Sequence, residues 1–251
     1  MKRYKKLLMI GATIMMVGTG CSNMALTTDQ KVEQAFEKHL SIYPVKSLED
    51  FYDMEGFRDE EFEKDDKGTW VVSSYFAEQK DNNSPLTSKG IVLFINRNKS
   101  DAKGKFIVDK ITDNHKHDES NEYPVEMKNN KIIPVGNMPR EIKEQIENYR
   151  FLVEDESFGD LSKLKRINQR YIEEMPLYTQ TFELPKKHIL NRWVQKNYEV
   201  DEKNAELYIE KSGDLKGSSI GDFNFEISYN PNNKNHKYYS ESVEFQPSLE
   251  E

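Results

Sequence analysis

The order of helical and strand patterns restricts the fold of this chain more than any other feature. Thr27 and Gln30 have capping-box spacing, and apolar residues then recur at helical intervals up to Leu40, so the sequence predicts an amphipathic helix. From Thr69 the pattern changes to strands rich in β-branched and aromatic residues, and a helix followed by strands occurs again in the second half. Because the strands are clustered, we expect an α+β fold in which antiparallel β-meanders pack with a few amphipathic helices.

Strands are predicted at 70–76, 91–95, 106–111, 123–127, 132–135, 177–184, 207–210, 223–229 and 239–245. The run 91–95 is continuously apolar, which is typical of a strand in the centre of a sheet. A turn at Asn129-Asn130 joins two of the strands into a hairpin. The order suggests two similar α+β halves, 29–156 and 157–251, which are equally compatible with one continuous domain, and no sequence repeat proves a duplication.

Three further helices are predicted between these strands. Ser47 can cap a short one, and Pro185 starts another. Asn137 and Pro139 open a longer helix, because proline suits a first turn, and its buried stripe is formed by Ile142, Ile146, Tyr149 and Val153. The basic segment 163–170 lacks the aromatic residues of a nucleic-acid platform, so we expect a solvated face there.

The first 20 residues have the three zones of a secretory signal peptide. Four basic residues precede the apolar run Leu7–Val17, and the small residues 18–20 follow it. The run has eleven residues, whereas a membrane-spanning helix needs about 20. We therefore expect residues 1–20 to be removed after export.

Cys21, the single cysteine of the chain, follows this signal directly. The segment resembles the lipobox of bacterial lipoproteins, in which the thiol receives a diacylglyceryl group and the preceding peptide bond is cut, although Gly18 occupies a position that is usually aliphatic. Two acyl chains are enough for stable anchoring. We therefore predict a lipid on Cys21, with residues 21–28 as the lipidated N-terminus and tether.

The charge of the mature chain excludes several partners. Removing the four basic residues of the signal leaves 32 Lys and Arg against 44 Asp and Glu, a net charge of −12. Binding to nucleic acid requires a basic face, which an acidic protein lacks. An anionic membrane repels an acidic protein, so the lipid alone is expected to attach this protein to the membrane. With one cysteine, neither a disulfide framework nor a thiolate metal site is predicted.

Three polar features resemble functional sites. His39 lies at the edge of the apolar stripe of the first helix and is expected to pack. The acidic stretch 57–68 lacks the alternating ligands and the glycine of a calcium loop, so a solvated loop is predicted. His115 and His117, with Asp118 and Glu119 beside them, have suitable ligands for zinc or copper but no apolar neighbours to fix a geometry, so no metal or cofactor is predicted.

The stretch "GSSIG" (217–221) matches the nucleophile motif of serine hydrolases, with Ser219 as nucleophile and Asp222 and His236 in the order of a triad. That motif requires a helix directly after the serine, whereas 223–229 alternates as a strand. The sequence favours a turn or bulge between two strands, and no catalytic residue is predicted.

Four stretches resemble the staphylococcal tandem lipoproteins, a paralogous family of lipid-anchored surface proteins: "FEKHLSIYPVKSLEDFYDMEGFRDEEFEKDDKGTW", "GIVLFINRN", "YPVEMKNNKIIP" and "SGDLKGSSIGDFNFEISY". The resemblance covers essentially the whole chain and assigns one functional residue, Cys21, as the lipidated position. It implies anchoring on the outer face of the cytoplasmic membrane, recognition of the lipid by host innate receptors, and a part in host contact or invasion.

Three classes of function follow from these observations. A non-catalytic surface interaction module with a host protein partner is favoured. A solute-binding lipoprotein of a transporter is disfavoured, because such proteins have two lobes with alternating strands and helices. The third class is an extracytoplasmic hydrolase that uses Ser219.

Overall fold

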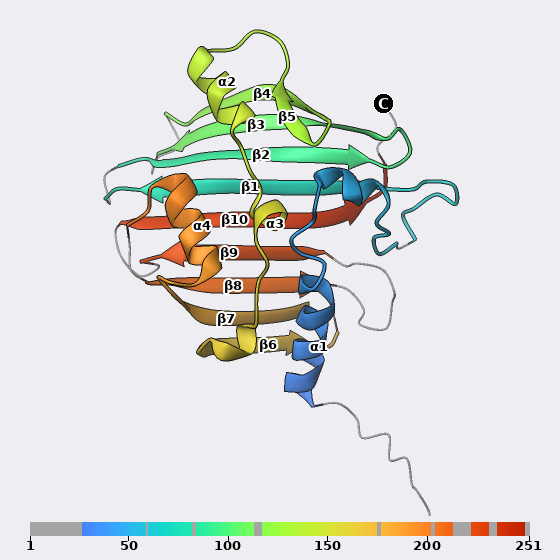
Figure 1. Ribbon diagram of the computed structural model, residues 1–251, viewed down its shortest axis with the longest axis vertical. Coiled ribbons are helices and arrows are strands. Elements are labelled where there is room, and N and C mark those ends of the chain that lie inside the picture. Colours follow the sequence, from blue (N-terminus) through green and yellow to red (C-terminus); the bar gives the residue numbers. More distant parts are fainter. Residues whose placement is uncertain are drawn as a thin grey trace, which may run out of the picture.

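The computed structural model describes residues 27–58, 60–81, 84–112, 117–174, 177–201, 204–212, 222–230 and 235–248. Within these residues, ten strands form one antiparallel sheet in the order β5-β4-β3-β2-β1-β10-β9-β8-β7-β6 (Figure 1). The first five strands run from the centre of the sheet to one edge, and the last five return from the opposite edge to the centre. The two halves therefore share one sheet.

The strands are β1 (Thr69–Gln79), β2 (Leu86–Asn96), β3 (Asp101–Ile111), β4 (Glu119–Lys128), β5 (Lys131–Pro134), β6 (Arg166–Ile172), β7 (Leu177–Pro185), β8 (Asn204–Ser212), β9 (Phe223–Tyr229) and β10 (His236–Gln246). The helices of the described residues are α1 (Thr28–Leu40), η1 (Leu48–Tyr52), α2 (Arg140–Glu147), α3 (Leu152–Asp155), η2 (Leu161–Lys163) and α4 (Ile189–Tyr198). The antiparallel meanders agree with the prediction. Strands dominate more than the expected α+β class implies, because the helices are short and cover only part of the sheet.

The two meanders are joined by β1, the first strand of one, and β10, the last strand of the other. β1 pairs with β10 over eleven residues, from Thr69 opposite Gln246 to Gln79 opposite His236. This pairing connects residues about 170 positions apart in sequence, so the sheet is complete only when strands from both halves of the chain have come together.

The helices lie on one face of the sheet (Figure 1). Residues 135–165, which we call the crossing segment, leave β5 at one edge, carry α2, α3 and η2 across that face, and reach β6 at the opposite edge. α1 packs over β6 and β7. The main hydrophobic core lies between this helical layer and the sheet.

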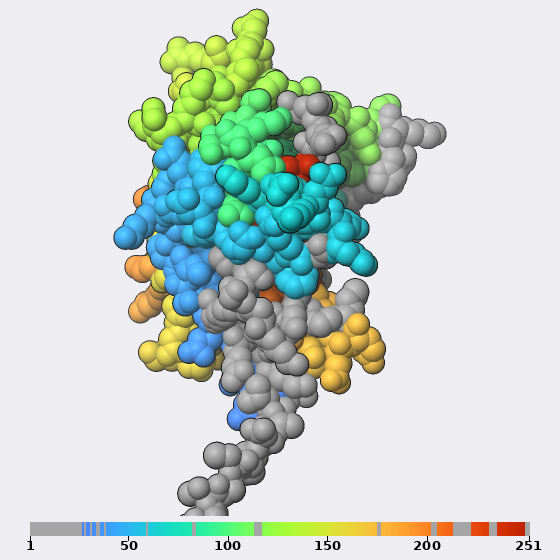
Figure 2. Space-filling view, turned by 90° about the vertical axis from the view of Figure 1, so that its right-hand side faces the viewer, coloured from blue at the N-terminus to red at the C-terminus, as the bar shows by residue number. Residues whose placement is uncertain are grey.

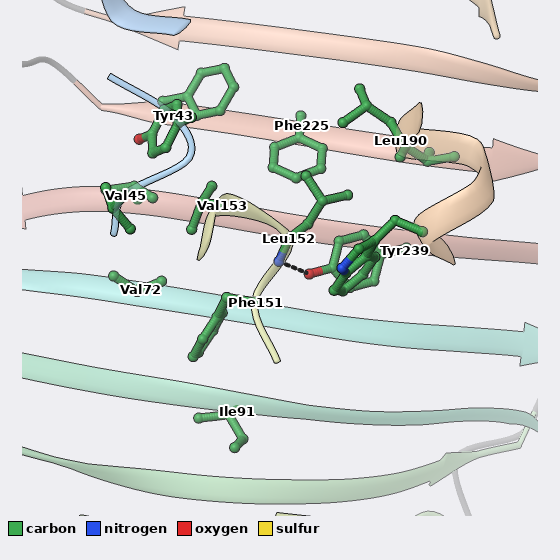
Figure 3. Packing of buried hydrophobic residues seen from close by; sticks show 14 of the residues in the cluster. Tyr43, Val45, Val72, Ile91, Phe151, Leu152, Val153, Leu190, Phe225 and Tyr239 are labelled. Atoms are coloured by element: carbon green, nitrogen blue, oxygen red, sulfur yellow. Dashed lines mark hydrogen bonds between the residues drawn. The ribbon is translucent and has the colours of Figure 1, made fainter. Parts of the chain in front are cut away.

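The crossing segment is held by its apolar side chains. Phe151, Leu152 and Val153 are fully buried between the segment and the central strands (Figure 3). Each such side chain contributes about 1.5–3 kcal/mol when it leaves water. The segment therefore closes the core that the two meanders share.

The structure corrects the predicted helix after Pro139. α2 ends at Glu147, and α3 begins only at Leu152, so the stripe from Ile142 to Val153 is divided between two helices. The hydroxyl group of Tyr149, in the interruption, lies 2.9 Å from Ser74 Oγ and donates to Ser74 O at 3.0 Å. Contacts with the sheet, which local periodicity cannot show, therefore break the helix.

Two further boundaries differ from the prediction. Arg166–Ile172, within and after the basic segment, forms the edge strand β6, paired with β7, which was not predicted, although the segment is mostly exposed as expected for a solvated face. Pro185 ends β7 instead of opening a helix, and α4 begins after its N-cap His188. An edge strand with mostly exposed or partly exposed side chains has no alternating pattern from which it could be recognised.

Candidate functional site

The face of the sheet opposite the helices presents large apolar side chains on β1, β2 and β3. Phe94 lies between Leu93 and Ile95, which are fully buried toward the helices, so its own side chain points to the other side. Phe94 is 37% exposed, Tyr75 39% and Ile111 39%. We call this side of the sheet the open face.

A glycine shapes the apolar part of the open face. Gly90 is paired with both Tyr75 and Ile107, and a Cβ atom there would lie 2.2 Å from Ser74 O. The position therefore accepts only glycine without movement of the backbone. Gly90 lines a hollow of about 330 Å³, whose walls also include Tyr75, Ile107 and Tyr238.

The open face changes to acidic on β8 and β9. Glu206 and Glu210 on β8, and Glu226 on β9, alternate with fully buried residues that face the core. Tyr208 is paired with Glu226, and its hydroxyl group donates to Glu210. Burial raises the pKa of Glu226 above its ordinary value. An apolar region and an acidic region therefore lie on the same face.

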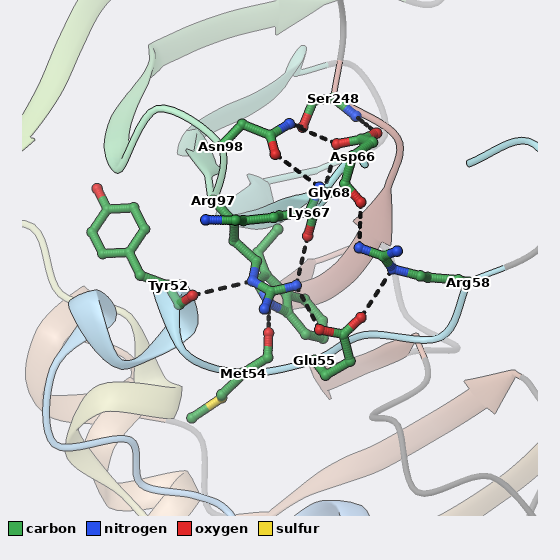
Figure 4. A network of polar contacts seen from close by, with 11 residues as sticks. Tyr52, Met54, Glu55, Arg58, Asp66, Lys67, Gly68, Arg97, Asn98 and Ser248 are labelled. Atoms are coloured by element: carbon green, nitrogen blue, oxygen red, sulfur yellow. Dashed lines mark hydrogen bonds and ion pairs between the residues drawn. The ribbon is translucent and has the colours of Figure 1, made fainter. Parts of the chain in front are cut away.

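The acidic stretch 57–68 forms part of a polar network at one end of the sheet (Figure 4). Asp66 accepts hydrogen bonds from the backbone N–H groups of Gly68 at 2.7 Å and Ser248 at 2.8 Å. Burial alone would raise the pKa of Asp66, but these bonds and those from Asn98 and Ser248 side chains lower it below its ordinary value. Asp66 thus links this stretch to the C-terminal residues.

Arg97 occupies the centre of the same network. Its guanidinium group donates to Tyr52 O at 3.1 Å and Lys67 O at 2.6 Å, and it forms an ion pair with Glu55 at 3.0 Å. Figure 2, which looks at the strand ends, shows the first part of the described chain (blue) beside the segment that leads into β1 (cyan). The acidic stretch therefore fastens these parts of the chain together.

Two of the three residues of the hydrolase motif, Asp222 and His236, lie far apart in the structure. Ser219 lies outside the described residues. Asp222 accepts the backbone N–H of Phe245 at 3.0 Å, near the end of β10, whereas His236 begins that strand opposite Gln79. Nine residues of strand, about 30 Å, separate Phe245 from His236.

The other polar residues considered in the sequence analysis are described one by one. His39 is buried on α1, in agreement with its expected packing role. His115 lies outside the described residues, and His117 is exposed. Asp118 accepts the backbone N–H of Thr112 at 2.7 Å, and Glu119 pairs with Lys110 at 3.1 Å. Within the part of the chain that the structure describes, no group of three or more His, Cys, Asp or Glu residues is arranged to hold a metal ion.

Cys21 and the signal also lie outside the described residues. Among the described helices, none combines the length and hydrophobicity needed to cross a membrane. The open face could not be predicted from sequence, because its apolar and acidic parts become neighbours only through the β1–β10 pairing.

Comparisons with known proteins define the class first: the chain is similar over nearly its whole length to uncharacterized lipoproteins of staphylococci. One from Staphylococcus epidermidis is 37% identical over 251 residues, with 98% of each chain covered. One from Staphylococcus aureus strain COL is 40% identical over 243 residues, covering 94% of this chain and 92% of the relative. The model of the Csa1 family matches residues 28–248, and the chain belongs to that family.

A solved structure, LprF from Mycobacterium bovis, is similar with a TM-score of 0.42 and 8% sequence identity, over 88% of this chain and 95% of LprF. The staphylococcal relatives bear out the predicted family of paralogous lipoproteins, and they support anchoring to a membrane through lipid.

Proposed function

We propose that this protein is held by the lipid on Cys21 at the outer face of the cytoplasmic membrane and acts there as a non-catalytic interaction module. Its partner is a host protein, and its lipid is the part that host innate receptors recognise. The observation that supports the proposal is the open face, where exposed apolar side chains lie beside an acidic region on a rigid sheet.

The open face is large enough for a specific interface. Strands spaced about 4.8 Å apart and about 30 Å long make a ten-stranded sheet about 45 Å wide, which gives roughly 1,400 Å² of surface. A standard interface buries about 800 Å² on each partner. A part of the open face would therefore be sufficient for an interface of standard size.

The distribution of charge indicates which partner would fit. Tyr75 and Phe94 offer the aromatic groups that are frequent at the centres of interfaces. Glu226 lies in register with Tyr75 two strands away, through Ser240, and favours basic residues on that side of the partner's apolar patch, whereas Lys103 lies opposite Phe94. Such complementarity mainly raises the rate of association, and it weakens at high salt.

Two other functions have less support. A hydrolase that uses Ser219 lacks a nearby pair of Asp222 and His236. A transporter's binding protein has two lobes of alternating strands and helices, whereas the described residues form one antiparallel sheet.

The test is capture of host surface proteins by the lipidated full chain in lipid nanodiscs. Two open-face variants, Tyr75→Glu and Phe94→Glu, are compared with Phe57→Glu, which changes an aromatic residue that is 42% exposed in the 57–68 stretch. We expect capture to fall at least tenfold for the first two and to remain for the control. Equal capture by all three variants would exclude the open face as the interaction surface.

Anchoring is tested separately with Cys21→Ala. Without the thiol no thioether can form, so the protein is expected to move from the detergent phase to the aqueous phase. Unchanged partitioning would refute the anchor without affecting the result for the open face.

A further inference from the structure

A cavity of about 580 Å³ lies on the helical side of the sheet, between α1, residues 157–162 of the crossing segment, and strands β6 and β7. Its apolar wall is formed by Phe36, Leu40, Tyr43, Phe158, Leu161 and Phe182. Sites for small molecules have volumes of about 300–1,000 Å³ and mostly apolar walls with a few polar groups. The cavity has both properties, and it is separate from the open face.

One polar group in this wall has no partner. Tyr43 is 4% exposed, and its hydroxyl oxygen is buried without a hydrogen bond. The ring itself is fixed, since it packs edge-on against Phe158 at 5.9 Å and stacks with Phe223 at 5.7 Å. The oxygen itself has no surface open to the cavity, and burial raises the pKa of Tyr43, so the residue offers a ligand its ring and no hydrogen bond.

The charged residues around the cavity are mainly acidic. Glu33 and Glu37 come from α1, and Asp160 comes from the crossing segment. Arg166 is the cationic residue of the lining, and it already lies 3.7 Å from Glu33 and 3.9 Å from Asp29. An anionic head group would therefore meet excess negative charge.

The position of α1 suggests where a ligand comes from. Thr28, the first residue of α1, is seven residues after Cys21, so an extended tether spans at most about 25 Å. If Cys21 carries the anchor, the cavity lies close to the membrane surface, where amphiphiles are abundant. At about 30 Å³ for each water-sized group, the cavity holds about 20 such groups, the size of one acyl chain with a small head.

From these observations we propose that the cavity binds an uncharged single-chain amphiphile. The acyl chain packs against the aromatic wall, which includes the ring of Tyr43. The uncharged head lies among the carboxylates of Glu33 and Glu37. Binding itself does not depend on the proposed interaction module, because the cavity and the open face are on opposite sides of the sheet.

The test uses the mature chain with Cys21→Ser, which keeps every described element and lacks a competing lipid. Binding of monolauroylglycerol is measured by calorimetry below its micelle concentration and compared with laurate, which has the same chain and an anionic head. We expect one monolauroylglycerol per protein, with at least tenfold weaker binding of laurate. The absence of stoichiometric binding, or equal affinity for both probes, would overturn the proposal.

Variants locate the ligand. Leu161→Glu places a charge in the apolar wall and is expected to weaken monolauroylglycerol binding at least tenfold, whereas Ile167→Glu, at a site on β6 that is 47% exposed and outside the lining, serves as the control. Glu37→Lys should bring the affinity for laurate close to that for monolauroylglycerol. Unchanged binding in both Leu161→Glu and Glu37→Lys would show that the probe binds elsewhere, and melting curves of each variant establish that the fold is retained.

Discussion

The carboxylate of Glu241, on the central strand β10, accepts the backbone N–H of Leu152 in the crossing segment at 2.8 Å. Its other oxygen accepts the N–H of Val153 at 3.1 Å, and Tyr239 donates its hydroxyl group to the same carboxylate. Glu241 is 1% exposed. The first N–H groups of a helix have no partner within it, so this buried carboxylate satisfies the start of α3 and fixes the crossing segment over the sheet.

Glu241 makes stability depend on pH. Burial raises its pKa to about 8, although the hydrogen bonds from Tyr239, Val153 and Leu152 act in the opposite direction. Between the ordinary pKa of about 4.3 and a pKa of about 8, the folded chain holds a proton that the unfolded chain has released. The free energy of unfolding is therefore expected to fall as pH rises from 5 to 8, by up to about 1.4 kcal/mol per pH unit.

Urea unfolding of the natural chain and of Glu241→Gln between pH 5 and pH 8 measures this effect. The amide cannot titrate, so the variant should lose most of the slope. Glu154 faces Glu241, and its own pKa is raised by burial, so it contributes a residual slope of the same sign in both proteins. Parallel curves for the two proteins would assign the pH dependence to other groups.

Phe151 should dominate the attachment of the crossing segment. It is fully buried and packs edge-on against Tyr149 at 5.6 Å. Phe151→Ala is expected to lower the free energy of unfolding by about 3–5 kcal/mol, because a large side chain leaves a cavity in a packed core. Phe57→Ala, at a site that is 42% exposed, should change it by less than about 1 kcal/mol, and similar losses in both variants would contradict a core role for Phe151.

Asn130 joins the β4–β5 hairpin to η1. Its φ angle is +56°, its side-chain oxygen accepts the N–H of Leu48 at 2.7 Å, and its own N–H donates to Glu49 at 3.1 Å. Asn130→Gly keeps the backbone angle but loses the acceptor, which should cost about 1 kcal/mol. Asn130→Ala adds the strain of a left-handed conformation, about 1–2 kcal/mol more.

Thermal unfolding of the two variants beside the natural chain checks this order. Equal losses of stability in Asn130→Gly and Asn130→Ala would mean that alanine adopts the positive φ angle at this position without strain.

The parts of the fold that were predictable are those that local sequence determines. The capping boxes at Thr27 and Ser47, and the turn at Asn129-Asn130, depend on residues a few positions apart. The break between α2 and α3 depends on the contact of Tyr149 with Ser74, 75 residues away, and on the bond from Leu152 to Glu241, 89 residues away, so no local pattern contains it. The same holds for the cavity, whose walls come from 33–43, 157–166 and 180–182.

The run 91–95 shows a second limit of what the sequence can predict about a strand. It was predicted to be central in its sheet because it is continuously apolar, and β2 does lie inside the sheet, between β1 and β3. β2 is nevertheless not buried on both faces of the sheet, because Phe94 is 37% exposed on the open face. Hydrophobic composition alone cannot distinguish a strand covered on both sides from one that keeps an apolar face available for binding.

The separation of Asp222 and His236 leads to a last prediction, on catalysis. A general base must lie within hydrogen-bond reach of its nucleophile and be oriented by a third group. Asp222 is bonded to Phe245, about 30 Å along β10 from His236, so a serine beside Asp222 cannot use both. Hydrolysis of short-chain nitrophenyl esters is therefore expected to be negligible and equal in the natural chain and in Ser219→Ala and His236→Ala. Measurable turnover that disappears in Ser219→Ala would revive the hydrolase alternative, and turnover that also survives in His236→Ala would point to a base other than the one the motif supplies.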